Sequence, residues 1–362
     1  MLTLVEALKK NKAVRVEPIV TDMHLLSLFG NTVQEVERAY GRAHRVPTNQ
    51  KSDTNEERGY TLARTMHGLT SVLARQKPDI LVVLGDRGEA LAAAQAALEL
   101  NVPVAHILGG DKAGNRDGVR INAITKLSHL HFPANADAYR RILRLGEEPW
   151  RVFNFGSTYI DHIVSKSYSP LPEVKKKYGI KENEPYVICI QHPTTPDEQN
   201  SYREAKVVYE ALKRLGMRTL LVWPCSDQGY SLVLKALDEY KDTPHFSIHK
   251  NIEAKDFWSL MSGASLMVGN SSSGLMETPY VGLPSVTVGH RQDGRARDTN
   301  VVSVPAPTVA KLLAAMRRVM SPAFAKNRRN HYVFGRGNAG QKIARVLATV
   351  PLAKLSAKKI TY

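Results

Sequence analysis

Three aspartates in the first half of the chain have the position expected of acid/base groups. Asp86 follows the apolar run 80–84, Asp111 follows a pair of glycines, and Asp117 lies in a loop before a helical pattern. Each of them taken singly is as typical of a helix cap or a turn. Carboxylates gathered at the ends of parallel strands can remove and return protons, so the three together are better candidates than any one.

The segment Gly269–Glu277 carries the strongest signal in the sequence, because small hydroxyl residues follow a strand and open a helix. The free N–H groups and positive dipole end of such a helix bind phosphate. Glu277 lies about one turn further on, where a carboxylate can accept hydrogen bonds from ribose hydroxyls. A plain Ser/Asn helix cap is the alternative. The candidate ligand-binding residues of this segment are Asn270, Ser271, Ser272, Ser273, Gly274 and Glu277.

Two further side chains suit a diphosphate. His192, in the string Gln-His-Pro-Thr-Thr, follows a strand and could bind a diphosphate or hold the proton of a leaving group. Arg291 follows the last strand of the second half and could pair with phosphate oxygens bidentately. A structural histidine and an exposed surface arginine are the respective alternatives.

Short β-branched runs alternate with helical patterns along the chain, which predicts βα units on parallel sheets. The expected strands are Val14–Val20, Ile80–Leu84, Val104–Ile107, Leu130–Phe132, Val152–Phe155, Tyr186–Ile190, Thr219–Trp223, Ser265–Val268 and Ser285–Val288. We therefore predict an α/β protein of two doubly wound, Rossmann-like domains that face each other across a cleft. Residues 1–164 form the first domain and residues 165–362 the second, with a linker at 165–182 and a C-terminal helix that can pack back on the first domain. Ligands of such sheets bind at the carboxyl ends of the strands.

Composition narrows the class of protein. The chain has 362 residues, of which 43% are hydrophobic and 23% charged, as in globular proteins. No apolar run approaches the roughly 20 residues that cross a bilayer, so we expect no membrane insertion. Two cysteines exclude a disulfide framework, no Cys/His cluster suggests a metal, and the compartment expected is the cytoplasm. The net charge of +16 leaves nucleic acid open as a partner, but dispersed basic residues and few aromatics favour a small anionic substrate.

Taken in order, the motifs resemble the hydrolysing UDP-N-acetylglucosamine 2-epimerases, in the branch that serves sialic acid synthesis, over nearly the whole chain. The motifs that carry the resemblance are Pro78-Asp79-Ile80, Gly85-Asp86-Arg87, His106 with Gly109-Gly110, Ala123-Ile124-Thr125-Lys126-Leu127-Ser128-His129, Arg151-Val152-Phe153-Asn154, Gly156-Ser157, Gly269–Glu277, Gly289 with Arg291-Gln292 and Gly294-Arg295, and Gly337-Asn338-Ala339.

The resemblance implies two domains of the GT-B type, a homodimer, and neither a metal nor a nicotinamide cofactor. It also implies a reaction in which the C2 proton of the sugar is removed and UDP leaves C1. Water then adds to the glycal intermediate and releases N-acetylmannosamine. When the family's roles are transferred to the matching positions of this sequence, the acid/base carboxylates would be Asp86, Asp111 and Asp117. The diphosphate would contact His192, Ser271, Ser272 and Arg291, and the ribose would contact Glu277.

The chain departs from the family pattern in the first half. Asp111 stands where the family often has Glu, and the family's Asp-Glu-x-x-Arg-His is replaced by residues 117–122, Asp-Gly-Val-Arg-Ile-Asn. The changed motif keeps two alternatives open: the same chemistry on a diacetamido or GDP-linked sugar, or a sugar-nucleotide-binding, glycosyltransferase-like relative without epimerase chemistry.

The beginning of the sequence also differs, since the family opens with a strand and a Gly-Thr-Arg loop that are not found here. We expect a gap beside Val14–Val20 and Ile80–Leu84, from a truncated start or filled by another segment. Direct pairing of these two segments would contradict that expectation.

Overall fold

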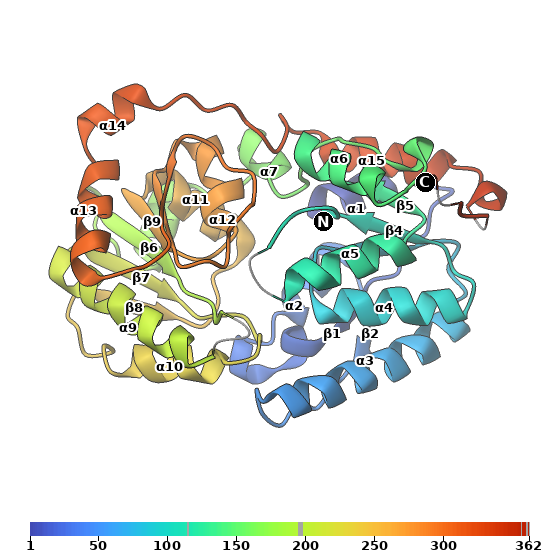
Figure 1. Ribbon diagram of the computed structural model, residues 1–362, viewed down its shortest axis with the longest axis horizontal. Helices are drawn as coiled ribbons and strands as arrows, with labels where there is room; N and C mark the ends of the chain where they lie inside the picture. The colour runs from blue at the N-terminus through green and yellow to red at the C-terminus, as the bar shows by residue number, and fades with distance from the viewer. Residues whose placement is uncertain (114–115, 195–197, 356, 360, 362) are drawn as a thin grey trace. The chain divides into compact units, whose positions relative to one another are not determined.

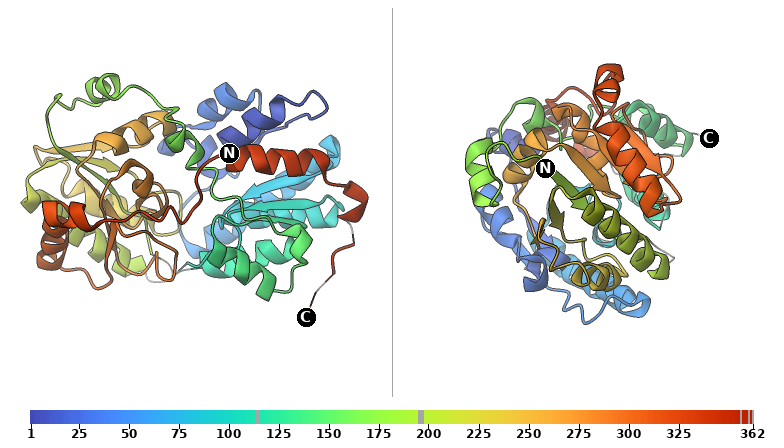
Figure 2. Two further views of the ribbon diagram at one scale, coloured as in Figure 1. Left: turned by 90° about the horizontal axis from the view of Figure 1, so that it is seen from above. Right: turned by 90° about the vertical axis from the view of Figure 1, so that its left-hand side faces the viewer.

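The computed structural model describes residues 1–113, 116–194, 198–355, 357–359 and 361, and it divides into two compact α/β units (Figure 1). Unit 1 comprises Met1–Ser27, Asn31–Asp161 and Val333–Tyr362, and unit 2 comprises Leu28–Gly30 and His162–Tyr332. The sequence had predicted a domain boundary between residues 164 and 165. The structure groups the last thirty residues with unit 1, because the C-terminal helix α15 (Ala339–Thr349) packs against the N-terminal helix α1 (Leu2–Lys9) (Figure 2).

Unit 2 is built on a parallel six-stranded sheet with the order β11-β10-β9-β6-β7-β8. This is the doubly wound Rossmann order, which reverses between β6 and β9 and leaves a crevice at the carboxyl ends of those two strands. The strands are β6 (Tyr186–Ile190), β7 (Arg218–Val222), β8 (Phe246–His249), β9 (Leu266–Gly269), β10 (Ser285–Val288) and β11 (Val301–Val304).

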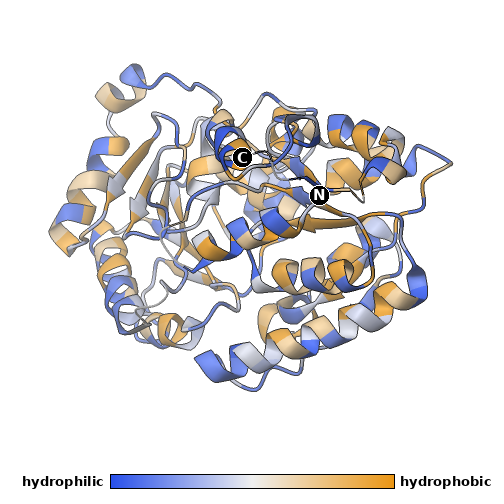
Figure 3. Ribbon diagram, turned by 45° about the vertical axis from the view of Figure 1, so that its right-hand side comes forward, coloured by the Kyte–Doolittle hydropathy of each residue, from blue (hydrophilic) through white to orange (hydrophobic). Residues whose placement is uncertain are grey.

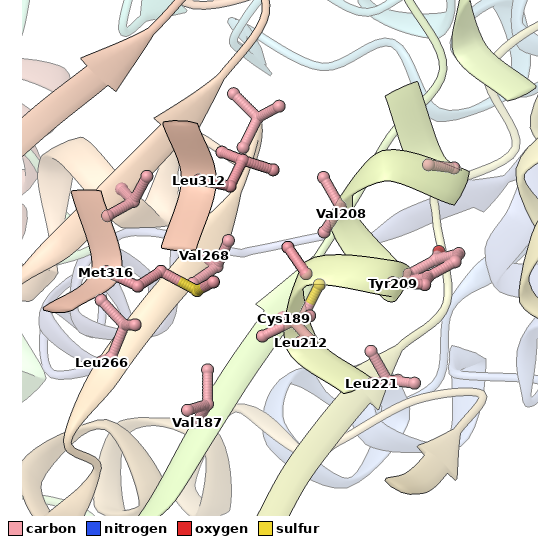
Figure 4. Packing of buried hydrophobic residues seen from close by; sticks show 14 of the residues in the cluster. Val187, Cys189, Val208, Tyr209, Leu212, Leu221, Leu266, Val268, Leu312 and Met316 are labelled. Atoms are coloured by element: carbon pink, nitrogen blue, oxygen red, sulfur yellow. The ribbon is translucent and has the colours of Figure 1, made fainter. Parts of the chain in front are cut away.

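Helices cover both faces of this sheet. On one face α9, α10 and α13 pack over a cluster of buried residues that includes Val187, Cys189, Leu212, Leu221 and Val268 (Figure 4). On the other face α8 packs on α11. The helices of unit 2 are α7 (Asp161–Val164), which begins at the last residue of unit 1, α8 (Leu171–Lys177), α9 (Glu198–Leu215), α10 (Tyr230–Asp238), α11 (Ala254–Gly263), α12 (Ser273–Met276), α13 (Val309–Val319) and α14 (Pro322–Asn327).

Unit 1 has two parallel sheets, β1-β2 and β3-β4-β5. Alternate residues of β3 and β4 enter two cores: Val83 and Val104 pack with α3 and α4, whereas Ala105 and Ile107 pack with α1 and α15. The helices accordingly show hydrophobic and hydrophilic residues side by side (Figure 3). The elements are β1 (Ile19–Thr21), β2 (His44–Val46), β3 (Leu81–Leu84), β4 (Val104–Ile107), β5 (Leu130–Phe132), α1 (Leu2–Lys9), α2 (Val33–Tyr40), α3 (Asn55–Gln76), α4 (Gly88–Glu99), α5 (Asp117–Leu127), α6 (Ala136–Arg144) and α15 (Ala339–Thr349).

The strand expected at Val14–Val20 is confined to Ile19–Thr21, which forms a ladder with β2 and not with β3. Val14 and Val16 instead pack as an irregular segment on the core beneath α1 and α15. The direct pairing with Ile80–Leu84 that would contradict the expected gap is therefore not found in the described chain. The edge of β3 away from β4 belongs to no ladder among the described residues.

Three other expectations need correction. The linker predicted at 165–182 contains α8, whose Val174 is buried, so Lys175, Lys176 and Lys177 lie on a helix. The strand predicted at Val152–Phe155 is reduced to one bridge between His131 and Val152. Its phenylalanines hold this segment by ring packing on Phe132, with ring centroids 5.7 and 6.4 Å away. Three strands, β2, β8 and β11, were not predicted, because each is only three or four residues long and partly exposed.

Of the helices in the described ranges, none is long and apolar enough to cross a membrane.

Candidate active site

Asn270 joins the two strand ends at the reversal point of the unit 2 sheet. Its Oδ1 accepts a hydrogen bond from the backbone N–H of His192 (2.7 Å), and its Nδ2 donates to the His192 carbonyl (2.9 Å). The side chain is fully buried. Gly269, just before it, has φ +127°, and a Cβ there would lie 2.0 Å from the Ile190 carbonyl oxygen. Only glycine allows this close approach of β9 to β6, and Gly269 thereby lets Asn270 lie beside the His192 backbone.

The ring of His192 is oriented by the next strand along the sheet. The backbone N–H of Cys225, three residues after β7, donates to His192 Nδ1 (3.2 Å), and Cys225 Sγ lies 3.3 Å from the same nitrogen. Because Nδ1 acts as an acceptor, a neutral His192 carries its proton on Nε2. Nε2–H is therefore the group that this ring offers to a ligand.

Arg291 follows β10 and lies at the same end of the unit 2 strands as His192 and Asn270. Its NH1 donates to the Asn270 carbonyl (3.3 Å), and its NH2 lies 3.5 Å from Asp227 Oδ2. Gln292 Nε2 donates to the same carbonyl (2.7 Å). The side chain of Arg291 is 13% exposed, so it is not the surface arginine of the alternative reading. His192, Asn270 and Arg291, taken from three separate motifs, are thus brought together.

The serine segment opens a helix, as predicted, but α12 is only four residues long and continues as the 3-10 helix η4 (Thr278–Val281). Ser272 is the N-cap residue without a side-chain cap bond, and Ser271 Oγ accepts from the Ser273 backbone N–H (3.4 Å). A four-residue helix has a much smaller dipole than a helix of several turns. The hydroxyl and N–H groups and the nearby Arg291 must therefore supply most of the attraction for an anion. Gly274 lies within α12 and packs against β10, where a Cβ would meet Ser285 Oγ at 2.7 Å.

Glu277 follows α12 as a buried carboxyl. Trp258 Nε1 donates to its Oε1 (3.4 Å), whereas its Oε2 has no hydrogen-bond partner among the described residues. Burial raises the pKa of Glu277, and the hydrogen bonds from Ser273 and Trp258 act in the opposite direction. Gln191, beside His192, is buried as well, and neither atom of its amide has a partner in the described part of the chain. Buried polar atoms without partners are rare in proteins and indicate where a ligand hydroxyl or amide would bind.

Asp86 lies in a turn at the carboxyl end of β3 in unit 1. His106, a buried residue of β4, holds this turn through Nε2, which is 2.8 Å from the Gly85 carbonyl oxygen. Burial lowers the pKa of His106 to about 4, so the ring is neutral at physiological pH. Gly85 has φ +74°, which lets the chain turn sharply and leave Asp86 at the strand end.

Asp111 and Asp117 are held by arginines. Asp111 Oδ1 lies 3.6 Å from NH2 of Arg141, and Asp117 Oδ1 lies 3.3 Å from NH1 of Arg120. Asp117 is the first residue of α5, and not part of the loop before it as the sequence had predicted. Arg120, displaced by one position from the family motif, is thus bound to Asp117 one turn away. Gly114 and Asn115 of this motif and Thr195 of the His192 motif lie outside the described residues.

The sequence did not predict a network of ion pairs that unit 1 contains besides the three candidate aspartates. Asp22, directly after β1, pairs with Arg58 of α3 and with Arg87, and Glu89 of α4 pairs with both arginines. The one sequence feature that could have indicated Asp22 is its position directly after the short β-branched run 19–21. Arg58 gave no signal, because 36 residues separate it from Asp22.

Among the described residues no set of three His, Cys, Asp or Glu side chains is arranged to hold a metal ion.

The chain matches the family model described as UDP-N-acetylglucosamine 2-epimerase over residues 6–348. It is 30% identical over 353 residues to a UDP-N,N'-diacetylbacillosamine 2-epimerase (hydrolyzing) of Legionella pneumophila, covering 97% of this chain and 93% of that protein. It is 33% identical over 284 residues to a UDP-N-acetylglucosamine 2-epimerase of Neisseria meningitidis, covering 78% and 74%.

The fold has a solved counterpart in the UDP-GlcNAc 2-epimerase of Neisseria meningitidis bound to UDP-GlcNAc, with a TM-score of 0.79 at 18% identity, covering 96% of this chain and 95% of that one. The predicted fold class of two Rossmann-like α/β units and the resemblance drawn from the motifs are confirmed. This chain belongs to the UDP-N-acetylglucosamine 2-epimerase family.

Proposed function

We propose that this protein is a hydrolysing 2-epimerase that converts UDP-N-acetylglucosamine to N-acetylmannosamine and UDP. A carboxylate removes the proton at C2 while the C1–O bond to UDP breaks, which leaves a glycal. Water then adds at C1, and a proton returns to C2 on the opposite face. The chemistry requires a base, an acid, and positive or N–H groups at the departing diphosphate.

The observation that carries the proposal is the group of hydrogen-bond donors at the carboxyl ends of β6 and β9 in unit 2. Asn270 fixes the His192 backbone, Cys225 leaves Nε2–H of His192 as the ligand donor, and Arg291 adds a guanidinium. These groups suit a diphosphate, and Ser271, Ser272 and Ser273 extend the same surface with hydroxyl and N–H groups. The unpartnered Oε2 of the buried Glu277 suits a ribose hydroxyl.

Unit 1 supplies the acid/base groups in this proposal. Asp86 is the candidate base, because His106 and the Gly85 turn hold its backbone at a strand end. Asp111 and Asp117 are the candidates for returning the proton, and each has an arginine beside it. The proposal needs neither a metal nor a redox cofactor, since the removal and return of a proton at C2, the loss of UDP and the addition of water at C1 account for every bond.

A proton NMR time course with UDP-N-acetylglucosamine in deuterated water tests the proposal. Free N-acetylmannosamine with deuterium at C2, together with released UDP, is the expected product. Asp86→Asn, which is nearly isosteric, is expected to abolish both product and exchange while UDP still binds. Intact UDP-N-acetylglucosamine whose resonances broaden would instead identify a binding protein without epimerase chemistry.

A UDP-linked 2,4-diacetamido sugar is the second candidate substrate. The relative matched over 97% of this chain carries that substrate class in its name, and residues 117–122 differ from the epimerase motif. A competition experiment with equal amounts of the two UDP-sugars measures the ratio of kcat/KM directly. A ratio in favour of the diacetamido sugar would replace UDP-N-acetylglucosamine as the substrate and leave the reaction type unchanged.

Assembly and location are part of the same proposal. We propose a homodimer, the commonest closed assembly, and a cytoplasmic enzyme. Light scattering of the purified protein and fractionation of cells test these two points. A nucleic-acid partner, which the net charge of +16 left open, predicts a salt-dependent shift of DNA in a gel, and we expect none.

A further inference from the structure

We propose that Trp258 is a positioning residue that holds the carboxylate of Glu277 for the ribose of UDP, and that it thereby sets the preference for a ribonucleotide over a deoxyribonucleotide. The inference rests on the proposed function, because it concerns the nucleotide half of the same substrate. Trp258 belongs to none of the motifs that indicated the family.

The backbone around Glu277 is fixed by its neighbours in the chain. The N–H of Glu277 donates to the Ser273 carbonyl (3.1 Å), and Thr278 Oγ1 donates to the Gly274 carbonyl (2.8 Å). Pro279 then lies in the first turn of η4. What remains to be set is the side chain of Glu277, so the contacts of its carboxylate decide where the two oxygens lie.

Trp258 supplies such a contact. Helix α11 packs against η4, and the indole Nε1 of Trp258 donates to Glu277 Oε1 at 3.4 Å. Both residues are buried, Trp258 with 5% and Glu277 with 6% of the surface exposed. An indole has a single N–H donor, which this bond uses. The bond occupies Oε1, and Oε2, without a partner among the described residues, is the oxygen that remains for a ligand hydroxyl.

His162 fixes the plane of the indole. The two rings are stacked, with centroids 5.1 Å apart and planes inclined by 17°. The N–H bond of an indole lies in the plane of its ring, so the stack limits the directions in which Trp258 can donate. Phenylalanine could fill the same stack on His162. The N–H is therefore the part that only tryptophan supplies at this position.

The carboxyl of Glu277 is costly to bury, since none of the described residues forms an ion pair with it. Burial raises its pKa, whereas the hydrogen bonds from Ser273 and Trp258 lower the pKa. The Trp258 N–H thus favours the ionised carboxylate, which accepts hydrogen bonds from hydroxyl groups at both oxygens. A buried carboxyl whose acceptor form is stabilised by neighbouring donors is typical of a binding site.

Two other ionisable groups lie near the indole. Asp256 is on the same helix, where its carboxylate accepts from Ser169 (2.7 Å) and Lys177 (2.6 Å), and His162 lies against the face of the ring. Their titration affects UDP and its deoxy analogues equally, and so does the titration of the diphosphate that these ligands share. A ratio of two affinities measured on one protein therefore isolates the contact with the ribose.

The test measures the Kd of UDP, 2′-deoxy-UDP and 3′-deoxy-UDP by calorimetry for the intact wild type and for Trp258→Phe. The wild type is expected to bind UDP at least about tenfold more tightly than one of the deoxy analogues. In Trp258→Phe this ratio should fall below about threefold, while the affinity for that analogue changes by less than about twofold. As the pH is lowered, the variant should lose the ratio at a higher pH than the wild type, because the pKa of Glu277 rises further without the N–H.

Two comparisons separate positioning from packing. Trp258→Phe added to Glu277→Gln should lose no more ribose preference than Glu277→Gln alone, because Trp258 acts through that carboxylate. In turnover of UDP-N-acetylglucosamine, Trp258→Phe is expected to raise KM and to change kcat by less than about twofold, because the ribose contact is the same in the ground and transition states. Trp150→Phe is the matched control, since Trp150 is 41% exposed in unit 1 and should change none of these values.

A second readout leaves Trp258 in place. The chain has three tryptophans, so the indole Nε1–H signals can be assigned by NMR with Trp150→Phe and with a variant of Trp223. The Trp258 signal should shift when UDP binds and shift less with the weaker deoxy analogue. Amide exchange of α11 checks that Trp258→Phe is folded.

An unchanged ratio in folded Trp258→Phe, or an equal loss of affinity for UDP and its deoxy analogues, would overturn the inference. A wild type without ribose preference, or a Trp258 signal that responds equally to all three ligands, would overturn it as well. Binding needs no turnover, so a protein that prefers UDP as expected but yields no N-acetylmannosamine would overturn the proposed function alone. A wild type that binds no UDP would overturn both.

Discussion

Acidification should loosen unit 1 through His106, and the size of the effect follows from the structure. Burial lowers the pKa of this imidazole to about 4, whereas an unfolded histidine titrates near pH 6.5. The folded form therefore excludes a proton that the unfolded form binds between these two values. The contribution of neutral His106 to stability is complete above about pH 6.5 and is lost as the pH falls toward 4.

At about pH 5.5 an unfolded histidine is roughly 91% protonated and the buried one about 3%, which corresponds to a loss of about 1.4 kcal/mol, or tenfold in the unfolding equilibrium. His129 lies in the same unit, and burial, with the charges of Lys358 and Arg151, lowers its pKa to about 4 as well. Because His129 is only partly buried, solvent screens its contribution, and the loss assigned to His106 alone is about 1.4 kcal/mol.

Hydrogen exchange of a peptide that spans β4, read by mass spectrometry, measures this loss within unit 1 alone. His106→Gln is the diagnostic variant, because its amide can still donate to the Gly85 carbonyl but does not titrate. After correction for intrinsic exchange rates, the fall in protection between about pH 7.5 and 5.5 should be about tenfold larger in the wild type than in the variant. An equal fall in both proteins would refute the assignment of the missing proton to His106.

Three further predictions concern two residues of the candidate site in unit 2 and one glycine of unit 1. Asn270→Asp replaces a donor to the His192 carbonyl with an oxygen, so we expect at least about tenfold weaker binding of UDP by calorimetry. Glu277→Gln removes a buried carboxyl whose pKa is raised by burial. The wild type should lose stability as the pH rises through that pKa, because the buried carboxyl must then ionise. Denaturant titrations of the variant should show no such loss. Gly110→Ala would place a Cβ 2.6 Å from the Ala138 carbonyl oxygen at φ +75°, and we expect unit 1 to lose more than about 2 kcal/mol in amide exchange.

The sequence by itself determined the local features of this protein. β-branched runs between helical patterns predicted the strands β3 to β6, because buried parallel strands are short, continuous and apolar. Glycines follow several of these runs in the sequence, and two of them, Gly85 and Gly269, lie at strand ends with positive φ. The order of the motifs was enough to indicate the family, since each one is read along the chain without knowledge of its neighbours in space.

Only the tertiary structure decided which of these features meet. Asn270 and His192 are 78 residues apart, and Asp22 and Arg87 are 65 apart, so neither pair leaves a periodic trace in the sequence. The sheet order decided the first pair, because β6 and β9 are neighbours through a crossover. Packing decided the second pair: Asp22 follows β1 and Arg87 follows β3, so the two side chains meet only once unit 1 has folded. Charges that are removed from water must then find partners.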